Sequence, residues 1–315
     1  MELIPDQQDL QPSNPTPNGP DKSFIPHSAF RTPHSGDPAW VRWLMSGITV
    51  GFLGVMVLVP VAAVFAEAFR NGLGAYWHNL TADPDTRHAV YLTLIVAPTS
   101  VALNVVFGLA AAWTIARFRF PGKPLLSALI DLPFSISPVV VGLMFVLLFG
   151  AKGYFGPWLR DHGFQILYTV PALILATTFV TLPFVAKELI PVMEAVGPDE
   201  ELAALSLGAN GRQIFWRITL ANVKWGLLYG ILLCNARAMG EFGAVYVVGG
   251  RIGGQTNTMP LEIETLFQGF NTPAAFALAS VLTMLAGVTL ALKSWVETKV
   301  LPMEPPSAVA ESLAG

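Results

Sequence analysis

Two oppositely charged side chains, Arg237 and Glu241, interrupt a long apolar segment in the second half of the chain. A charge at the centre of a bilayer costs about 2.5–3.5 kcal/mol on insertion scales, so such residues face a protein interior or a water-filled path. Their spacing of four places both on one face of a helix, where they can pair. Two interpretations stay open: an ion pair that fixes helix packing, and a gate or anion contact on a translocation path.

The other reactive side chains form no catalytic or metal-binding pattern. The five histidines lie in predicted loops or the N-terminal tail, and Cys234 is the single cysteine. Neither a Gly-x-x-x-x-Gly-Lys-Ser/Thr phosphate loop nor a His-Glu-x-x-His zinc motif occurs. We therefore expect no catalytic residue in this chain and no metal or cofactor bound by it. The chain also lacks the residues that an intramembrane enzyme would need. A net charge of -3 gives no basic face for nucleic acid.

The elements that must position the charged pair are apolar helices. Hydrophobic residues make up 53% of the 315 residues and charged residues only 12%, against about 25% charged in soluble domains. Six segments reach the roughly 20 residues that a membrane-spanning helix needs. They are predicted at residues 41–69, 88–116, 125–150, 167–189, 223–248 and 274–296, within a transmembrane domain over residues 40–300. Gly226 and Gly230 in the fifth are spaced for close helix approach.

Lys and Arg residues are unevenly divided between the two sides of these spans. Twelve of the 18 fall on the side that holds both termini, five on the other, and Arg237 lies within the fifth span. The positive-inside rule therefore predicts cytoplasmic termini. Arg237, about 21 Å along a helix that starts near Val223, would then lie in the outer half of the membrane. Residues 1–39 hold eight prolines and are predicted as a disordered cytoplasmic tail, and residues 301–315 as a second cytoplasmic tail.

The longest cytoplasmic connection, residues 197–221, carries helix signals of its own. Pro198 and the acidic residues 199–201 favour a helix start, and Gly208 suits the left-handed position that ends a helix. A second amphipathic helix is predicted from about Asn210, with one apolar face made of Ile214, Phe215 and Ile218. A short helix, a sharp turn and a second helix would form a projection able to dock into a cleft on a soluble motor.

This connection resembles the signature of permease subunits of ATP-binding-cassette importers, Glu-Ala-Ala, three residues, Gly, nine residues and Ile-x-Leu-Pro. Aligned on Gly208, the matching positions are Ala203, Ala204, Ile218 and Leu220. Two positions differ. The glutamate position holds Leu202, with Glu201 one residue earlier, and the proline position holds Ala221. The family pattern alone therefore does not assign the usual ATPase contact to Glu201.

In this family the short helix is a coupling helix that sits in a groove of the ATPase subunit. The resemblance therefore implies a set of ATPase-coupling residues, which are Glu201, Leu202, Ala203, Ala204, Gly208 and Ala209. ATP and Mg would be used by that partner, because the chain has no phosphate loop. The implied fold is an all-α integral membrane protein with six transmembrane helices, the type I importer permease fold, and a cytoplasmic coupling helix.

Three segments are similar to the sulfate/thiosulfate importer permeases, and in particular to the W-type of their two paired membrane subunits. They are residues 131–140, 225–230 and 235–245, the last of which contains Gly-Glu-Phe-Gly. The resemblance covers about residues 41–300. It implies import of sulfate and thiosulfate across a bacterial inner membrane. The implied partners are a second homologous permease, two ATPase subunits, a periplasmic sulfate-binding protein and membrane lipid.

Two alternatives to a sulfate importer remain. Molybdate and tungstate permeases carry a similar Gly-Glu-Phe-Gly segment, so that segment alone does not choose the anion. A secondary anion transporter would need internal repeats or an ion-coupling constellation of its own. No obvious repeat and no second buried carboxylate beyond Glu241 is visible in the sequence.

Overall fold

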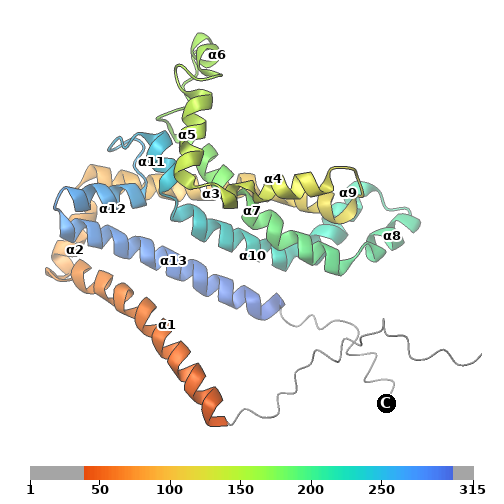
Figure 1. Cartoon of the computed structure of the whole chain (residues 1–315), viewed down its shortest axis with the longest axis horizontal. Coiled ribbons are helices and arrows are strands. Elements are labelled where there is room, and N and C mark those ends of the chain that lie inside the picture. The colour runs from red at the N-terminus through yellow and green to blue at the C-terminus, as the bar shows by residue number, and fades with distance from the viewer. Residues whose placement is uncertain (1–38, 301–315) are drawn as a thin grey trace, which may run out of the picture. The chain divides into compact units, whose positions relative to one another are not determined.

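The computed structural model describes residues 39–300, which contain helices and their connections and no β-strand. In chain order the helices are α1 (Ala39–Ala68), α2 (Gly72–Thr81), α3 (Pro84–Arg117), α4 (Lys123–Ser135), α5 (Pro138–Phe149), α6 (Gly156–Asp161), α7 (Val170–Val196), α8 (Asp199–Ser206), α9 (Gly211–Ile214), the π-helical η2 (Phe215–Thr219), α10 (Leu220–Met239), α11 (Gly243–Gly249), α12 (Met259–Gln268) and α13 (Thr272–Val300). Except for Ala39, the predicted tails lie outside the described residues. The chain to Val57 and the chain from Leu58 form separate units, and the second holds all the sites below (Figure 1).

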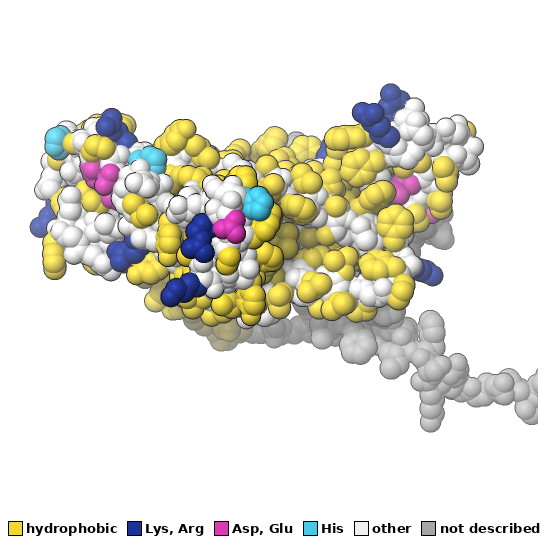
Figure 2. Space-filling view, turned by 90° about the horizontal axis from the view of Figure 1, so that it is seen from above, with side chains coloured by type: hydrophobic (Ala, Val, Ile, Leu, Met, Phe, Trp, Pro, Cys, Tyr) yellow, Lys and Arg dark blue, Asp and Glu magenta, His cyan; other side chains and the backbone are white. Residues whose placement is uncertain are grey.

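Five of the described helices are long and apolar enough to cross a membrane, and the bent pair α4–α5 makes a sixth if it forms one span. The predicted all-α fold with six spans is therefore confirmed when α4–α5 is counted as one. Figure 2 shows apolar side chains over much of one face, with charged side chains gathered mainly near its ends and in a cluster near its middle. Large exposed apolar surfaces of this kind are typical of membrane or protein contact.

The third predicted span, residues 125–150, is formed by two helices and not by one straight helix. Helix α4 ends at Ser135, α5 begins at Pro138, and the two are bent by 108°. Pro138 has no backbone N–H to continue the helix, and it disfavours the helical conformation at Ser137, whose ψ is 136°. Helix α5 therefore leaves the direction of α4 and carries α6 at its far end (Figure 1).

The fifth predicted span, residues 223–248, differs from the structure at both ends. One helix runs from Gly211 through η2 to Met239, so the second loop helix and the span are continuous. Ala221 has the backbone N–H that a continuing helix needs, which a proline would lack. Gly240 follows the last helical residue and α11 forms separately, so Glu241 lies outside the helix that holds Arg237.

Helix α7 lies at the centre of the bundle, where it packs on α3 and α10, and α10 also packs on α13. The buried side chains between these helices include Ala97, Val101, Val185, Leu189 and Cys234. Cβ atoms built on the two predicted small positions of α10 would lie 3.0 Å from Val192 Cγ2 at Gly226 and 3.4 Å from Val185 Cα at Gly230. The predicted close approach of helices at these glycines is therefore confirmed.

Gly108 of α3 lies where α3 closely approaches α7. A Cβ atom there would lie 2.9 Å from Val185 Cβ and 3.1 Å from the backbone nitrogen of Ala186. We expect Gly108→Ala to destabilise the protein by about 1–3 kcal/mol through overpacking. Gly287→Ala in α13 is the matched control, because nothing lies within 4 Å of its built Cβ. The thermal midpoint of the detergent-solubilised protein should fall only for Gly108→Ala, and equal midpoints would contradict the prediction.

Candidate functional site

Helix α8 forms where the sequence predicts the coupling helix. Three acidic residues, 199–201, occupy its first turn, where the helix dipole favours negative charge. Gly208 adopts the left-handed conformation with φ of 85°. The backbone N–H of Gly208 donates to Leu205 O at 3.0 Å and that of Ala209 to Ala204 O at 3.0 Å, the paired hydrogen bonds of a Schellman motif. The predicted sharp turn after a short helix is confirmed.

The second helix of the loop begins with a capping box at Asn210. Its side-chain oxygen accepts from the Gln213 N–H at 2.9 Å, and its own N–H donates to Gln213 Oε1 at 3.0 Å. The predicted apolar face is half-buried, while Trp216 and Arg217 are exposed. The Phe215 ring makes an edge contact with Trp113 of α3, with centroids 5.6 Å apart. This face therefore packs the loop onto the membrane helices.

Two acidic residues tie α8 to the bundle: Glu200 accepts from Asn222 Nδ2 of α10 at 2.6 Å, and Glu201 makes the larger set of contacts. Arg117, the last residue of α3, donates from Nε to both carboxylate oxygens at 3.1 Å and from Nη2 to Oε1 at 3.0 Å. Arg117 Nη1 also donates to Met193 O of α7 at 2.8 Å, and Thr219 Oγ1 of η2 donates to Glu201 Oε1 at 2.8 Å. The Arg117 and Glu201 side chains are only 9% and 17% exposed. One carboxylate therefore joins α3, α8 and η2, and through Arg117 reaches α7.

Exposed leucines lie on α8 and directly after it, beside the exposed acidic residues Asp199 and Glu200. Leu202, Leu205 and Leu207 are 57%, 58% and 89% exposed. Among the other predicted coupling residues, Ala203 and Gly208 are exposed, and Ala204 and Ala209 are half-buried. The predicted set thus contains two kinds of residue. Glu201 is bound by side chains of this chain, whereas the exposed members of the set are accessible to a partner. An ATPase contact of any of them stays a prediction.

Arg237 and Glu241 pair as predicted, although a helix end separates them. Arg237 Nη1 lies 2.7 Å from Glu241 Oε2, and their side chains are 34% and 1% exposed. Glu241 Oε1 accepts from the Ala244 N–H at 3.1 Å, at the first turn of α11. The buried carboxylate therefore joins the end of α10 to the start of α11 and presents the partly exposed arginine.

The Glu241 carboxylate also borders a small space between α3, α7, α10 and α11. A cavity of about 10 Å³ is lined by Glu241, Thr93, Thr177, Thr258 and apolar neighbours. Thr93 Oγ1 accepts from the backbone N–H of Met259 at 2.8 Å, which fixes the start of α12 against α3. No sequence pattern pointed to these threonines.

A carboxyl group with a shifted pKa lies in α12, outside the helices that can span the membrane. Burial raises the pKa of Glu262, the hydrogen bond from Asn257 opposes this, and the charges of Asp83 and Asp85 raise it further. The Asn257 Nδ2 atom donates to Glu262 Oε2 at 2.8 Å. This contact closes the connection between α11 and α12.

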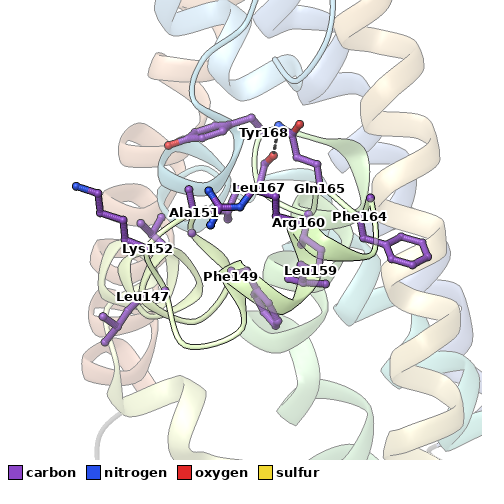
Figure 3. A pocket seen from close by; sticks show the side chains of 16 residues that line it. Leu147, Phe149, Ala151, Lys152, Leu159, Arg160, Phe164, Gln165, Leu167 and Tyr168 are labelled. Carbon is purple, nitrogen blue, oxygen red and sulfur yellow. Dashed lines mark hydrogen bonds between the residues drawn. The ribbon is translucent and has the colours of Figure 1, made fainter.

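A cavity of about 850 Å³ lies at the hairpin of α5 and α6 (Figure 3). Its charged lining residues are Lys152 and Arg160, and Gln165 Nε2 donates to Leu167 O at 3.2 Å. Figure 3 shows Lys152 pointing away from the cavity. None of the residues of the coupling loop or of the Arg237–Glu241 pair lines it. Size alone therefore does not make it the functional site, and among residues 39–300 no cluster of His, Cys, Asp or Glu could hold a metal.

Comparisons with known proteins agree on one family. The family model described as "Binding-protein-dependent transport system inner membrane component" matches residues 104–301. The chain is 51% identical over 259 residues to "Sulfate transport system permease protein CysW" of Synechocystis, covering 82% of this chain and 94% of that protein. It is 48% identical to CysW of Escherichia coli K12, covering 82% and 88%, and 37% identical to CysT of the same strain, covering 76% and 86%.

Solved structures show the same fold at low sequence identity. A bacterial alginate ABC transporter, solved with an alginate-bound periplasmic protein, matches with a TM-score of 0.69 and 17% identity, covering 84% of this chain and 96% of that chain. The helices, the coupling loop and these matches lead to one assignment. The chain belongs to the binding-protein-dependent transport system inner membrane components, the multi-pass inner-membrane permeases of ABC transporters, and within them to the family of the sulfate transport system permease proteins.

Proposed function

We propose that this chain is the permease subunit of an ATP-driven importer that passes sulfate, and also thiosulfate, across the bacterial inner membrane. The choice of anion is supported by the named relatives, CysW and CysT, which are sulfate permease proteins. The ATP-driven mechanism is supported by one structural observation above all. Helix α8 exposes leucines on its outer side while Glu201 ties its inner side to Arg117 at the end of a membrane helix.

That arrangement suits the transmission of force from a soluble partner. Burial of exposed leucines of a helix in a groove of another chain contributes favourable free energy to binding. Motion of α8 would pass to α3 and η2 through the Glu201 contacts, and to α7 through the Arg117 contact with Met193 O. We propose that the partner is an ATPase subunit that binds ATP and Mg, that two such subunits serve two paired permeases, and that a periplasmic binding protein delivers the anion.

The proposed orientation places α8 and both termini in the cytoplasm. Arg117 pairs with Glu201 of α8, and Lys123 lies near Glu194 at the end of α7. Arg212 and Arg217 follow α8 in the chain, and all four belong to the side that holds the excess of Lys and Arg. The positive-inside rule favours the cytoplasm for that side. The α12 side and the α11–α12 connection would then face the periplasm.

The test is uptake of radiolabelled sulfate by sealed vesicles that contain this chain, the second permease, the ATPase and the binding protein. We expect uptake that requires ATP and that disappears when this chain is omitted or the ATPase is inactivated by mutation. In mild detergent this chain should copurify with an ATPase in fixed stoichiometry. A matched set of vesicles with molybdate and tungstate as competitors tests the anion.

Each outcome has a distinct meaning. If molybdate or tungstate is taken up and sulfate is not, the proposed substrate is wrong and the proposed coupling mechanism still holds. Anion uptake that persists without ATP and without an ATPase partner would contradict the importer function and favour a secondary transporter.

A further inference from the structure

A second intramembrane ion pair lies between α4 and α7, away from the Arg237–Glu241 pair in sequence. Lys187 Nζ lies 2.8 Å from Asp131 Oδ1, and the two side chains are 49% and 40% exposed. Asp131 lies about 12 Å along α4 from Lys123, and Lys187 about 13 Å from the end of α7 at Val196, at 1.5 Å per residue. Since the hydrocarbon core is about 30 Å thick, the pair lies well inside the membrane, in its proposed inner half.

The exposure of this pair is unusual for charges at such depth. Charged side chains within spans avoid lipid and face a bundle interior or a water-filled cavity. Helix α4 also has an apolar side, which exposes Leu125, Leu129 and Leu132. At 3.6 residues per turn these leucines lie roughly 100–160° around the helix from Asp131. The charged side of α4 is thus distinct from its apolar side.

The charged side forms a groove with polar groups along its length. The groove has a volume of about 300 Å³, and its polar lining residues are Lys123, Ser127, Asp131, Lys187 and Glu194. Lys123 Nζ and Glu194 Oε1 are 3.6 Å apart near the α8 end of both helices.

One turn beyond the Lys187–Asp131 pair, outside the residues that line the groove, the rings of Phe134 and Phe184 meet edge to face, with centroids 5.2 Å apart. An aromatic contact next to a polar groove suits a vestibule beside a hydrophobic constriction.

We propose that the α4–α7 groove lines the inner half of the anion path, and that Lys187 is the cation that the permeating oxyanion meets there. This proposal rests on the proposed function. An ammonium group offers three donors to a tetrahedral oxyanion. Asp131 holds Lys187 in place when no anion is present and competes with the anion for it. Conduction needs such weak binding, because a site that holds an ion too tightly does not release it.

The first test measures whether the groove is in water, without relying on transport. In a Cys234→Ala background, Ser127→Cys lies in the groove and Leu129→Cys on the exposed apolar side of α4, at nearly the same depth. A charged, membrane-impermeant methanethiosulfonate is added to the cytoplasmic side of the full complex. We expect labelling at 127 at least tenfold faster than at 129. Equal, slow labelling at both positions would mean that lipid or another subunit covers the groove, and would overturn the proposal.

The second test measures transport. Lys187→Gln should lower sulfate uptake at least tenfold in correctly assembled complex, and Lys187→Arg should retain part of it. Lys293→Gln is the matched control, because Lys293 is also an ion-paired lysine in a span, 3.6 Å from Glu297. Wild-type uptake by assembled Lys187→Gln would overturn the role of Lys187. Absence of sulfate uptake by the wild-type complex, with rapid labelling at 127, would instead contradict the proposed substrate and keep the groove as an aqueous path.

Discussion

Arg117→Ala is expected to uncouple ATP hydrolysis from transport. The substitution leaves the Glu201 carboxylate, 17% exposed, with only its Thr219 hydrogen bond, and removes the contact with Met193 O. Breaking one partner of a buried pair costs about 3–5 kcal/mol, which is enough to shift the seating of α8 on the bundle about 100-fold or more. Sulfate uptake should fall at least about tenfold, while the ATPase activity of the assembled complex persists.

The controls separate loss of the pair from loss of a positive charge. Arg119→Ala removes an exposed arginine two residues away and should leave the ratio of anions imported to ATP hydrolysed unchanged. Glu201→Gln keeps a side-chain acceptor for Thr219 and should be milder than Arg117→Ala. The double variant Arg117→Ala with Glu201→Ala should recover part of the lost coupling, because no unpaired charge remains. If Arg117→Ala and Arg119→Ala behave alike, Glu201 does not connect α8 to the membrane helices.

The coupling loop was the part of the chain that its sequence predicted best. The turn chemistry of Gly208 and the capping residue Asn210 act within a few residues, so local sequence is sufficient to place both helices. Arg117 lies 84 residues from Glu201 along the chain, and no local pattern indicates which cation a carboxylate will meet. The main contact of Glu201 could therefore be found only from the structure.

Two membrane segments show that an apolar composition does not indicate where a helix ends. Residues 125–150 and 223–248 are each largely apolar, so composition predicts one span in each. The helices end after Ser135 and Met239 because of the backbone conformation near Pro138 and Gly240. The apolar sequence continues across both helix ends, so hydrophobicity does not indicate them. The pairing of Arg237 with Glu241 was predicted from helical spacing. The pairing is confirmed, although α10 ends at Met239, between the two residues.

The same limit applies to Lys187 and Asp131. Both lie in segments that the sequence predicts as spans, but the partners are on different helices. Only the packing of α4 on α7 brings them together. Charges in a span can be found from sequence, whereas the side of the helix on which they meet depends on tertiary packing.

Arg237→Ala is expected to reduce sulfate uptake about tenfold without preventing assembly. The buried Glu241 cannot face a passing dianion, since it is 1% exposed and paired, whereas the Arg237 side chain is 34% exposed. An exposed carboxylate beside Arg237 would repel a dianion, but the carboxylate of Glu241 is buried and paired. This arrangement leaves a cation positioned by a buried carboxylate at the junction of α10 and α11.

The full series tests whether the pair acts on the path or only holds the helices together. Arg237→Lys should keep part of the uptake, and Glu241→Gln, which still offers an oxygen to the Ala244 N–H, should reduce it by loosening Arg237. Lys224→Ala removes an exposed cation from the same helix and is the control. Uptake is measured on complexes shown by size-exclusion chromatography to be assembled. If the pair is only structural, removing both charges should restore uptake and stability together. If Arg237 meets the anion, the double variant should assemble and remain as slow as Arg237→Ala, because the unpaired charge is gone but the cation on the path is gone with it.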